Sequence, residues 1–178
     1  MKPIQPFSCK HNPIVKLSLI SFLMFSSLTL IAQTPTDFSG KWEYDKTRSD
    51  KEPGYEYFDG IVLEINQNSN LITFTDTYFL PGKEGVAAPP DSFLLDGRVT
   101  TDNGGTGPAK KFVVWSEDKK ILTTNSIMTD SVDGVKQDFL TAKSYKLSDD
   151  LKTLFLDEFY KSKLNGEKTI KKAYKKKT

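Results

Sequence analysis

The stretch YKLSDDLKTLFLDEFY, residues 145–160, contains two runs of alternating apolar and polar residues on either side of the polar segment 148–152. Successive side chains of a β-strand point to opposite faces, so each run predicts a strand with one apolar face. A connection of this length joins neighbouring strands as a hairpin. The stretch therefore predicts an antiparallel pair, with strands at 138–147 and 153–160.

Short alternating segments separated by turn residues recur from residue 40 to the C-terminus, and none shows a helical period. The other strands are expected at 40–44, 58–67, 71–80, 92–101, 110–116, 121–128 and 169–177, with Asp96-Gly97 as a bulge or tight turn. Consecutive strands with hairpin-length connections favour an all-β fold, an antiparallel up-and-down β-barrel of about eight or nine strands, which leaves no sheet edge exposed.

The N-terminal segment has the pattern of a targeting sequence. Lys2, Lys10 and Lys16 precede or adjoin the apolar run LSLISFLMFSSLTLI, which is shorter than the roughly 20 residues of a membrane-spanning helix. We therefore expect residues 1–32 to be a signal peptide and residues 33–178 to form the barrel domain, exported to the periplasm or outside the cell. An uncleaved membrane anchor is the alternative.

Removal of this segment changes the chemistry that the chain can support. Cys9 and His11 are lost with it, and the formal net charge changes from +2 to −1. The remaining chain has no Cys or His, which excludes disulfides, a Cys nucleophile, a Ser-His-Asp triad and Cys- or His-ligated zinc. The charge argues against nucleic-acid binding. An enzyme would need carboxylate, Lys or Tyr chemistry, so the sequence leans against one and assigns no catalytic residue, cofactor or metal.

Four stretches resemble motifs of the small secreted lipocalin-like proteins of bacteria, which are members or relatives of the calycin barrels. They are FSGKWEYDKTRSD at 38–50, FLLDGR at 93–98, YKLSDDLKTLFL at 145–156 and IKKAYKK at 170–176. The resemblance implies a calycin-type barrel that binds a small molecule. In lipocalins an arginine near the last strand packs over the Trp of the first strand, whereas here that strand contains lysines.

Candidate site residues follow from the face that each strand turns inward. Apolar neighbours predict that Asn125, Lys143 and Glu158 face inward on three successive strands, near the end of the barrel where Trp42 begins the first strand. Two interpretations stay open. Trp42 could lie over Lys143, itself paired with Glu158, as a plug of the barrel floor, or these groups could orient the polar end of a ligand.

Aromatic residues of other strands complete the predicted ligand-binding set, which comprises Trp42, Phe74, Tyr78, Trp115, Asn125, Lys143, Tyr145 and Glu158. Asp76 is expected to face inward beside Phe74 and Tyr78, as a rim carboxylate or a catalytic acid. The predicted function is non-catalytic binding of a small, largely apolar molecule. The alternative is a structural or interaction module whose filled barrel acts through its loops or its last strand.

The C-terminal segment is strongly basic, with eight lysines and one acid from Lys161 onward. These lysines could simply be solvated and discourage edge pairing. Alternatively, they could contact an anionic surface through Lys171, Lys172, Lys175, Lys176 and Lys177.

Overall fold

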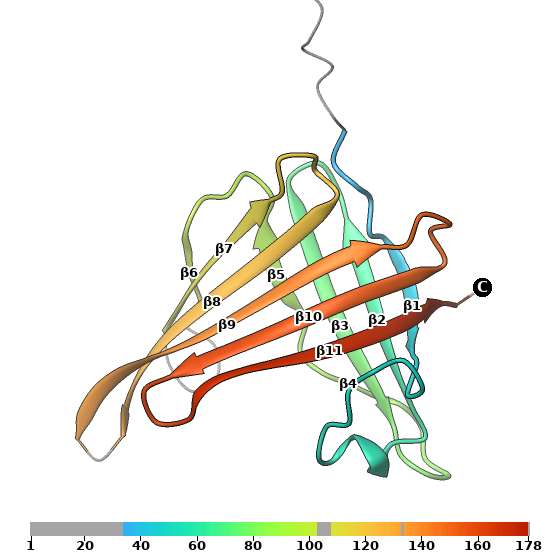
Figure 1. Ribbon diagram of the computed structural model, residues 1–178, viewed down its shortest axis with the longest axis horizontal. Helices are drawn as coiled ribbons and strands as arrows, with labels where there is room; N and C mark the ends of the chain where they lie inside the picture. The colour runs from blue at the N-terminus through green and yellow to red at the C-terminus, as the bar shows by residue number, and fades with distance from the viewer. Residues whose placement is uncertain (1–33, 103–107, 133, 178) are drawn as a thin grey trace, which may run out of the picture. The chain divides into compact units, whose positions relative to one another are not determined.

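The computed structural model describes residues 34–102, 108–132 and 134–177, which form eleven β-strands and one 3-10 turn (Figure 1). The expected signal peptide, 1–32, lies outside the described residues. No helix within those ranges is long and apolar enough to cross a bilayer. The elements are β1 Gly40–Tyr44, η1 Tyr55–Tyr57, β2 Gly60–Gln67, β3 Leu71–Phe79, β4 Val86–Ala87, β5 Asp91–Leu94, β6 Thr100–Asp102, β7 Ala109–Trp115, β8 Ile121–Val132, β9 Val135–Leu147, β10 Thr153–Ser162 and β11 Gly166–Lys176.

All strand pairs are antiparallel, which confirms the predicted all-β fold. The hydrogen-bonded order is β4-β3-β2-β1-β11-β10-β9-β8-β7-β6, and β5 pairs with the free side of β3. The first strand thus lies beside the last (Figure 1). In the register of this pair Tyr44 is opposite Tyr174. The hairpin predicted at 145–160 is β9–β10, in which Leu147 lies opposite Leu154 and Lys143 opposite Glu158.

The barrel has one seam without a backbone ladder. Among the described residues no strand pairing joins β5 to β7. Side chains cross this seam instead, because the Nζ of Lys111 on β7 lies 2.6 Å from Oδ1 of Asp91 on β5 and 5.6 Å from the centre of the Phe93 ring. The sheet is therefore an open barrel that an ion pair and a cation–π contact hold together at the seam.

The segment predicted as one strand at 92–101 is two strands. β5 and β6 are separated by a turn in which Gly97 has φ +78°, a conformation that favours glycine, and Asp96 accepts a hydrogen bond from the Arg98 amide. Because of this extra reversal, every later connection lies at the end of the barrel opposite to the one predicted. The connections 116–120 and 148–152 thus lie at the end where β1 begins, since Thr153 is paired with Lys175 and Lys176 with Trp42.

That end is filled by an aromatic plug, which we define as Phe38, Trp42 and Trp115. Phe38 and Trp42 are fully buried, and the indole N–H of Trp42 donates to the carbonyl of Phe38 at 3.0 Å. The Phe38 ring stacks on Trp115 with centroids 6.1 Å apart and meets Tyr145 edge-on at 6.4 Å. The Phe38 amide donates to the side chain of Gln67, which fixes the segment that precedes β1 across the barrel end.

The connection between β1 and η1 continues along the edge of β11 beyond the end of β1. The amides of Asp45 and Asp50 donate to the carbonyls of Ala173 and Lys171, each at 2.8 Å. The Asp45 carboxylate accepts hydrogen bonds from the Thr47 side chain and amide. These bonds, with Lys175 at 3.0 Å, outweigh the effect of burial and lower the pKa of Asp45 to about 2.

Replacing Phe38, which contacts both tryptophans of the aromatic plug, should destabilise the barrel. Phe38→Ala removes a fully buried ring and leaves a cavity, so we expect a loss of about 3–5 kcal/mol in the free energy of unfolding, measured by denaturant titration. Tyr57→Ala is the matched control, because its ring is 68% exposed. Equal losses in the two variants would contradict the plug.

Asp45 predicts a pH dependence of stability. Its folded-state pKa is lower than the ordinary value, so its contribution is present at neutral pH and is lost as the pH falls from about 4 to about 2. Asp45→Asn should therefore cost about 1–2 kcal/mol at pH 7, and the gap to the parent protein should shrink at pH 3. A gap that stays constant over this range would refute the assignment.

Candidate functional site

An interior cavity of about 220 Å³ lies beyond the aromatic plug. Strand alternation turns every second side chain toward the cavity. Asp76 on β3 thus lies beside Leu63 on β2, and Lys143 on β9 lies beside Glu158 on β10. Its tyrosines come from η1 and four strands: Tyr55, Tyr78, Tyr145, Tyr160 and Tyr174. Carboxylates and a lysine thus share the cavity with many aromatic rings.

The cavity lies toward the end of the barrel opposite the plug. Its outer members are Tyr55 in η1, Pro89 before β5 and Tyr160 near the end of β10. Its inner wall is Phe74 stacked on Tyr145, with ring centroids 4.6 Å apart and planes at 18°. One end of the barrel is therefore closed by rings, and the other end holds the cavity.

Glu158 is the centre of the charged network in the cavity wall. It is buried, with one oxygen 2.8 Å from the Nζ of Lys172 and the other 3.4 Å from the Nζ of Lys143, and it accepts a hydrogen bond from Tyr160. Burial favours the protonated acid, but the charges of Lys143 and Lys172 and these hydrogen bonds outweigh it and lower the pKa of Glu158. Glu158 is therefore an anion held between two lysines.

Lys172 is the buried cation of the same network. Its Nζ lies 2.9 Å from a carboxylate oxygen of Glu52 and donates to the hydroxyl of Tyr55 at 2.9 Å. Burial opposes the charged form, but Glu158, Tyr55 and Glu52 together raise the pKa of Lys172. The network thus joins β10 and β11 to Glu52, in the connection between β1 and η1, and to Tyr55 in η1.

Asp76 differs from the other charged groups in the cavity. It lies between Phe74 and Tyr78 on the inner face of β3, and its carboxylate has no hydrogen bond or ion pair with any side chain in the part of the chain that the structure describes. Burial raises its pKa, and the charge of Lys143 only partly offsets this. Burial, together with the charge of Asp76, raises the pKa of Tyr78 to about 12.

Five of the eight predicted site residues line the cavity together, namely Phe74, Tyr78, Lys143, Tyr145 and Glu158. The expected contact of Lys143 with Glu158 is present. The predicted location of Trp42 above Lys143 is wrong, because the Trp42 ring lies in the plug. The lysine over this ring is Lys176, whose Nζ is 5.4 Å from the ring centre. Trp115 also belongs to the plug. The split of the predicted strand 92–101 explains this, since it puts Lys143 and Glu158 toward the other end.

The prediction that Asn125 faces inward is wrong. On β8 the buried residues are Leu122 and Thr124, which places Asn125 on the outer face. There the hydroxyl of Thr123 pairs with that of Ser144. Alternating threonines and aliphatic residues occur on both faces of this strand, so its pattern did not identify the inner one.

Lys172 also departs from prediction, because its side chain is only 2% exposed and has no access to an anionic surface. Its place between Ile170 and Tyr174 on one face of the last strand was a signal that sequence reasoning missed. Contact with an anionic surface stays a prediction for the exposed lysines Lys171, Lys175, Lys176 and Lys177. Tyr55 was missed as well, since a residue in an irregular connection has no periodic signal.

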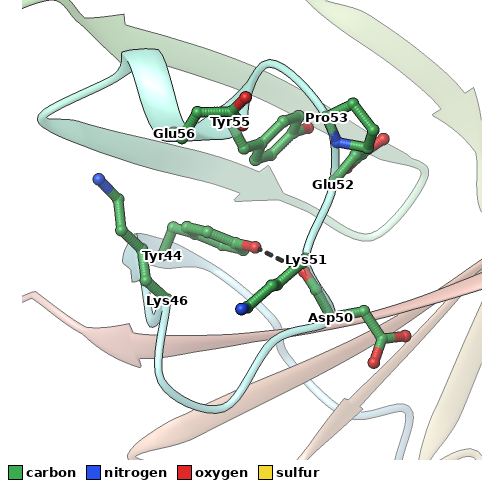
Figure 2. Close-up of a pocket in the computed structure, with 8 residues that line it drawn as sticks. All are labelled: Tyr44, Lys46, Asp50, Lys51, Glu52, Pro53, Tyr55 and Glu56. Atoms are coloured by element: carbon green, nitrogen blue, oxygen red, sulfur yellow. Dashed lines mark hydrogen bonds between the residues drawn. The ribbon is translucent and has the colours of Figure 1, made fainter.

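A second hollow, of about 580 Å³, lies under the connection that follows β1, and Figure 2 shows its lining. Most of its members, including Lys46, Lys51 and Glu56, are exposed side chains of that connection. Tyr55 lines both this hollow and the interior cavity. We take the interior cavity as the candidate site because its groups converge from strands held in register by the sheet.

Comparison with solved structures finds a likeness of fold. No protein-family model and no curated protein matches the chain. Its fold is similar to a crystal structure of zebrafish ileal bile acid-binding protein complexed with cholic acid, with 21% identity, a TM-score of 0.43, and coverage of 79% of this chain and 98% of that one. The cholic acid is a property of that protein. The resemblance to secreted bacterial lipocalin-like proteins stays a prediction.

Removing the buried cation should destabilise the protein more than removing an exposed one. Lys172→Met leaves Glu52 without its lysine and Glu158 with only Lys143, so we expect a loss of about 3–5 kcal/mol in the free energy of unfolding at pH 7. Lys171→Met is the control, because that side chain is exposed on the same strand and its loss should change stability by less than about 1 kcal/mol.

The loss in Lys172→Met should diminish as the pH falls and the carboxylates take up protons. Denaturant titrations at pH 7 and pH 4.5 measure this. A similar loss in Lys171→Met, or no dependence on pH, would contradict the network.

Proposed function

We propose that the protein is an exported, non-catalytic binding protein that holds a small molecule in its interior cavity. The observation that supports this most is the cavity itself, which is walled by rings and by charged groups from β3, β5, β9 and β10. A barrel filled by its own side chains, which is the alternative, would have no such space. Export is proposed from the basic residues and the apolar run at the N-terminus.

The dimensions and lining of the cavity limit the class of ligand. Its volume of about 220 Å³ is below the roughly 300–1,000 Å³ of pockets for drug-sized molecules, so the ligand is smaller than these. Leu63, Leu156 and Phe74 offer apolar contacts, and Asp76 and Tyr78 offer polar ones. Nine of the thirteen lining residues carry a charged or hydroxyl group, so we infer a compact ligand that is largely polar and makes apolar contacts on only part of its surface.

Polar groups in the cavity need partners that the protein does not fully supply. Asp76 is partly exposed in the cavity and has no hydrogen bond to a side chain within the described ranges. Its carboxylate can therefore accept a hydrogen bond from the polar end of a ligand.

Native mass spectrometry of the protein purified from the cells that export it tests this proposal. We expect an additional small-molecule mass on the parent protein, with a polypeptide mass that begins at Gln33. Leu156→Trp places an indole in the cavity and should abolish the adduct. Val114→Trp, on the 52% exposed outer side of β7, should retain it.

Circular dichroism should show that each variant has folded. If Leu156→Trp does not fold, Leu63→Phe is the smaller substitution that also reduces the cavity. An absent adduct in the parent protein would overturn the proposal, and so would an adduct that persists in every cavity variant.

A further inference from the structure

We propose that the ligand of the interior cavity carries a positive charge, as an organic ammonium group that pairs with Asp76. This inference rests on the proposed function and names the chemistry of its ligand. It follows from the charges of the cavity, from its rings and from the position of Asp76 among them.

The lysines at the cavity already have carboxylate partners. Lys143 lies 3.4 Å from Glu158, and Lys172 lies within 2.9 Å of both Glu158 and Glu52. Lys111, at the seam, pairs with Asp91. Lys172 in addition is closed off from solvent. An anionic ligand would therefore have to displace a protein carboxylate to reach Lys111 or Lys172, and it could reach Lys143 only beside Glu158 and Asp76.

Asp76 is the carboxylate left over. Each of the other acids of the cavity, Asp91 and Glu158, has a lysine within hydrogen-bond distance. Asp76 has no such partner in the described part of the chain. An ammonium group at this carboxylate would restore the balance of charge and supply the missing hydrogen bonds. A carboxylate or phosphate ligand would instead be repelled by it.

The walls around Asp76 suit a cation as well. Phe74 and Tyr78 are its neighbours on the same face of β3, and Tyr145 and Tyr174 line the cavity from β9 and β11. Tyr78, Tyr145 and Tyr174 line the same cavity as Asp76. Aromatic faces attract cations, above all where water is excluded.

The charged groups that face Asp76 set the pH dependence of binding. They are Lys143 on β9, Glu158 on β10, Lys172 on β11, Asp91 on β5, and the hydroxyls of Tyr55, Tyr78, Tyr145 and Tyr174. With its carboxyl half-hidden from solvent, Asp76 takes up a proton at a higher pH than an ordinary aspartate. Affinity for an ammonium should thus fall as the pH falls through this raised pKa.

Isothermal titration calorimetry with matched probes tests the inference. The probes are 2-phenylethylammonium and butylammonium, each compared with the neutral alcohol of the same carbon skeleton, 2-phenylethanol and 1-butanol. At pH 7 we expect at least one ammonium to bind about tenfold or more tightly than its alcohol, as for a close charge pair shielded from water. Asp76→Asn should remove this preference, so that the ammonium binds no more tightly than its alcohol. Asp157→Asn, an exposed carboxylate on the outer face of β10, is the control that should change neither.

The carboxyl ¹³C resonance of Asp76 gives an independent readout. It should titrate at a raised pKa in the free protein, and addition of the ammonium should lower that pKa.

Several outcomes would overturn the inference while the proposed function stands, provided that native mass spectrometry shows a bound molecule. One is equal affinity for each ammonium and its alcohol, or binding of the alcohols alone. Another is no binding of any probe at millimolar concentration, and a third is an Asp76 that is protonated at pH 7. Absence of any molecule in native mass spectrometry would instead remove the proposed function itself.

Discussion

The buried ion pair of Glu158 and Lys172 is the constraint on which the cavity end of this barrel depends. Charges leave water at a high energetic cost unless other charges and hydrogen bonds replace the solvent. Here Lys143, Glu52 and Tyr55 provide these contacts, so the pair links β10 and β11 to the connection that carries η1. The same few residues therefore hold the barrel wall together and set the charges of its interior.

The two ends of the barrel differ in what fills them. At one end Phe38 and Trp42 exclude water with rings, and the only polar atom of the indole is satisfied by a carbonyl. At the other end charged and phenolic groups surround a cavity, and among its carboxylates only Asp76 lacks a lysine partner within the described structure. An imbalance confined to one carboxylate is what a binding site for a complementary cation would show. This contrast between a dry end and a polar end supports the proposed function.

The extent of prediction differed from strand to strand for physical reasons. In β9 and β10 the inward side was identified from Tyr145 with Leu147 and from Leu154 with Leu156, and Lys143 and Glu158 followed from it, although Phe155 lies on the opposite face of β10. β8 has aliphatic residues and threonines on both faces, so the inward position expected for Asn125 was wrong. The ends at which Trp42 and Lys143 lie depend on the number of reversals between them, and a tight turn at Gly97 adds one.

The sequence by itself determined that this chain forms antiparallel strands, where most of them begin and end, and which inner faces are apolar, because side-chain alternation is a local property of the backbone. Only the tertiary structure decided that Lys172 is buried, that Phe38 rather than Lys143 meets Trp42, and that Asp76 is left without a partner. Those outcomes depend on the register between strands distant in sequence and on an irregular connection folded over them. Neither the register nor the connection has a period that could be read along the chain.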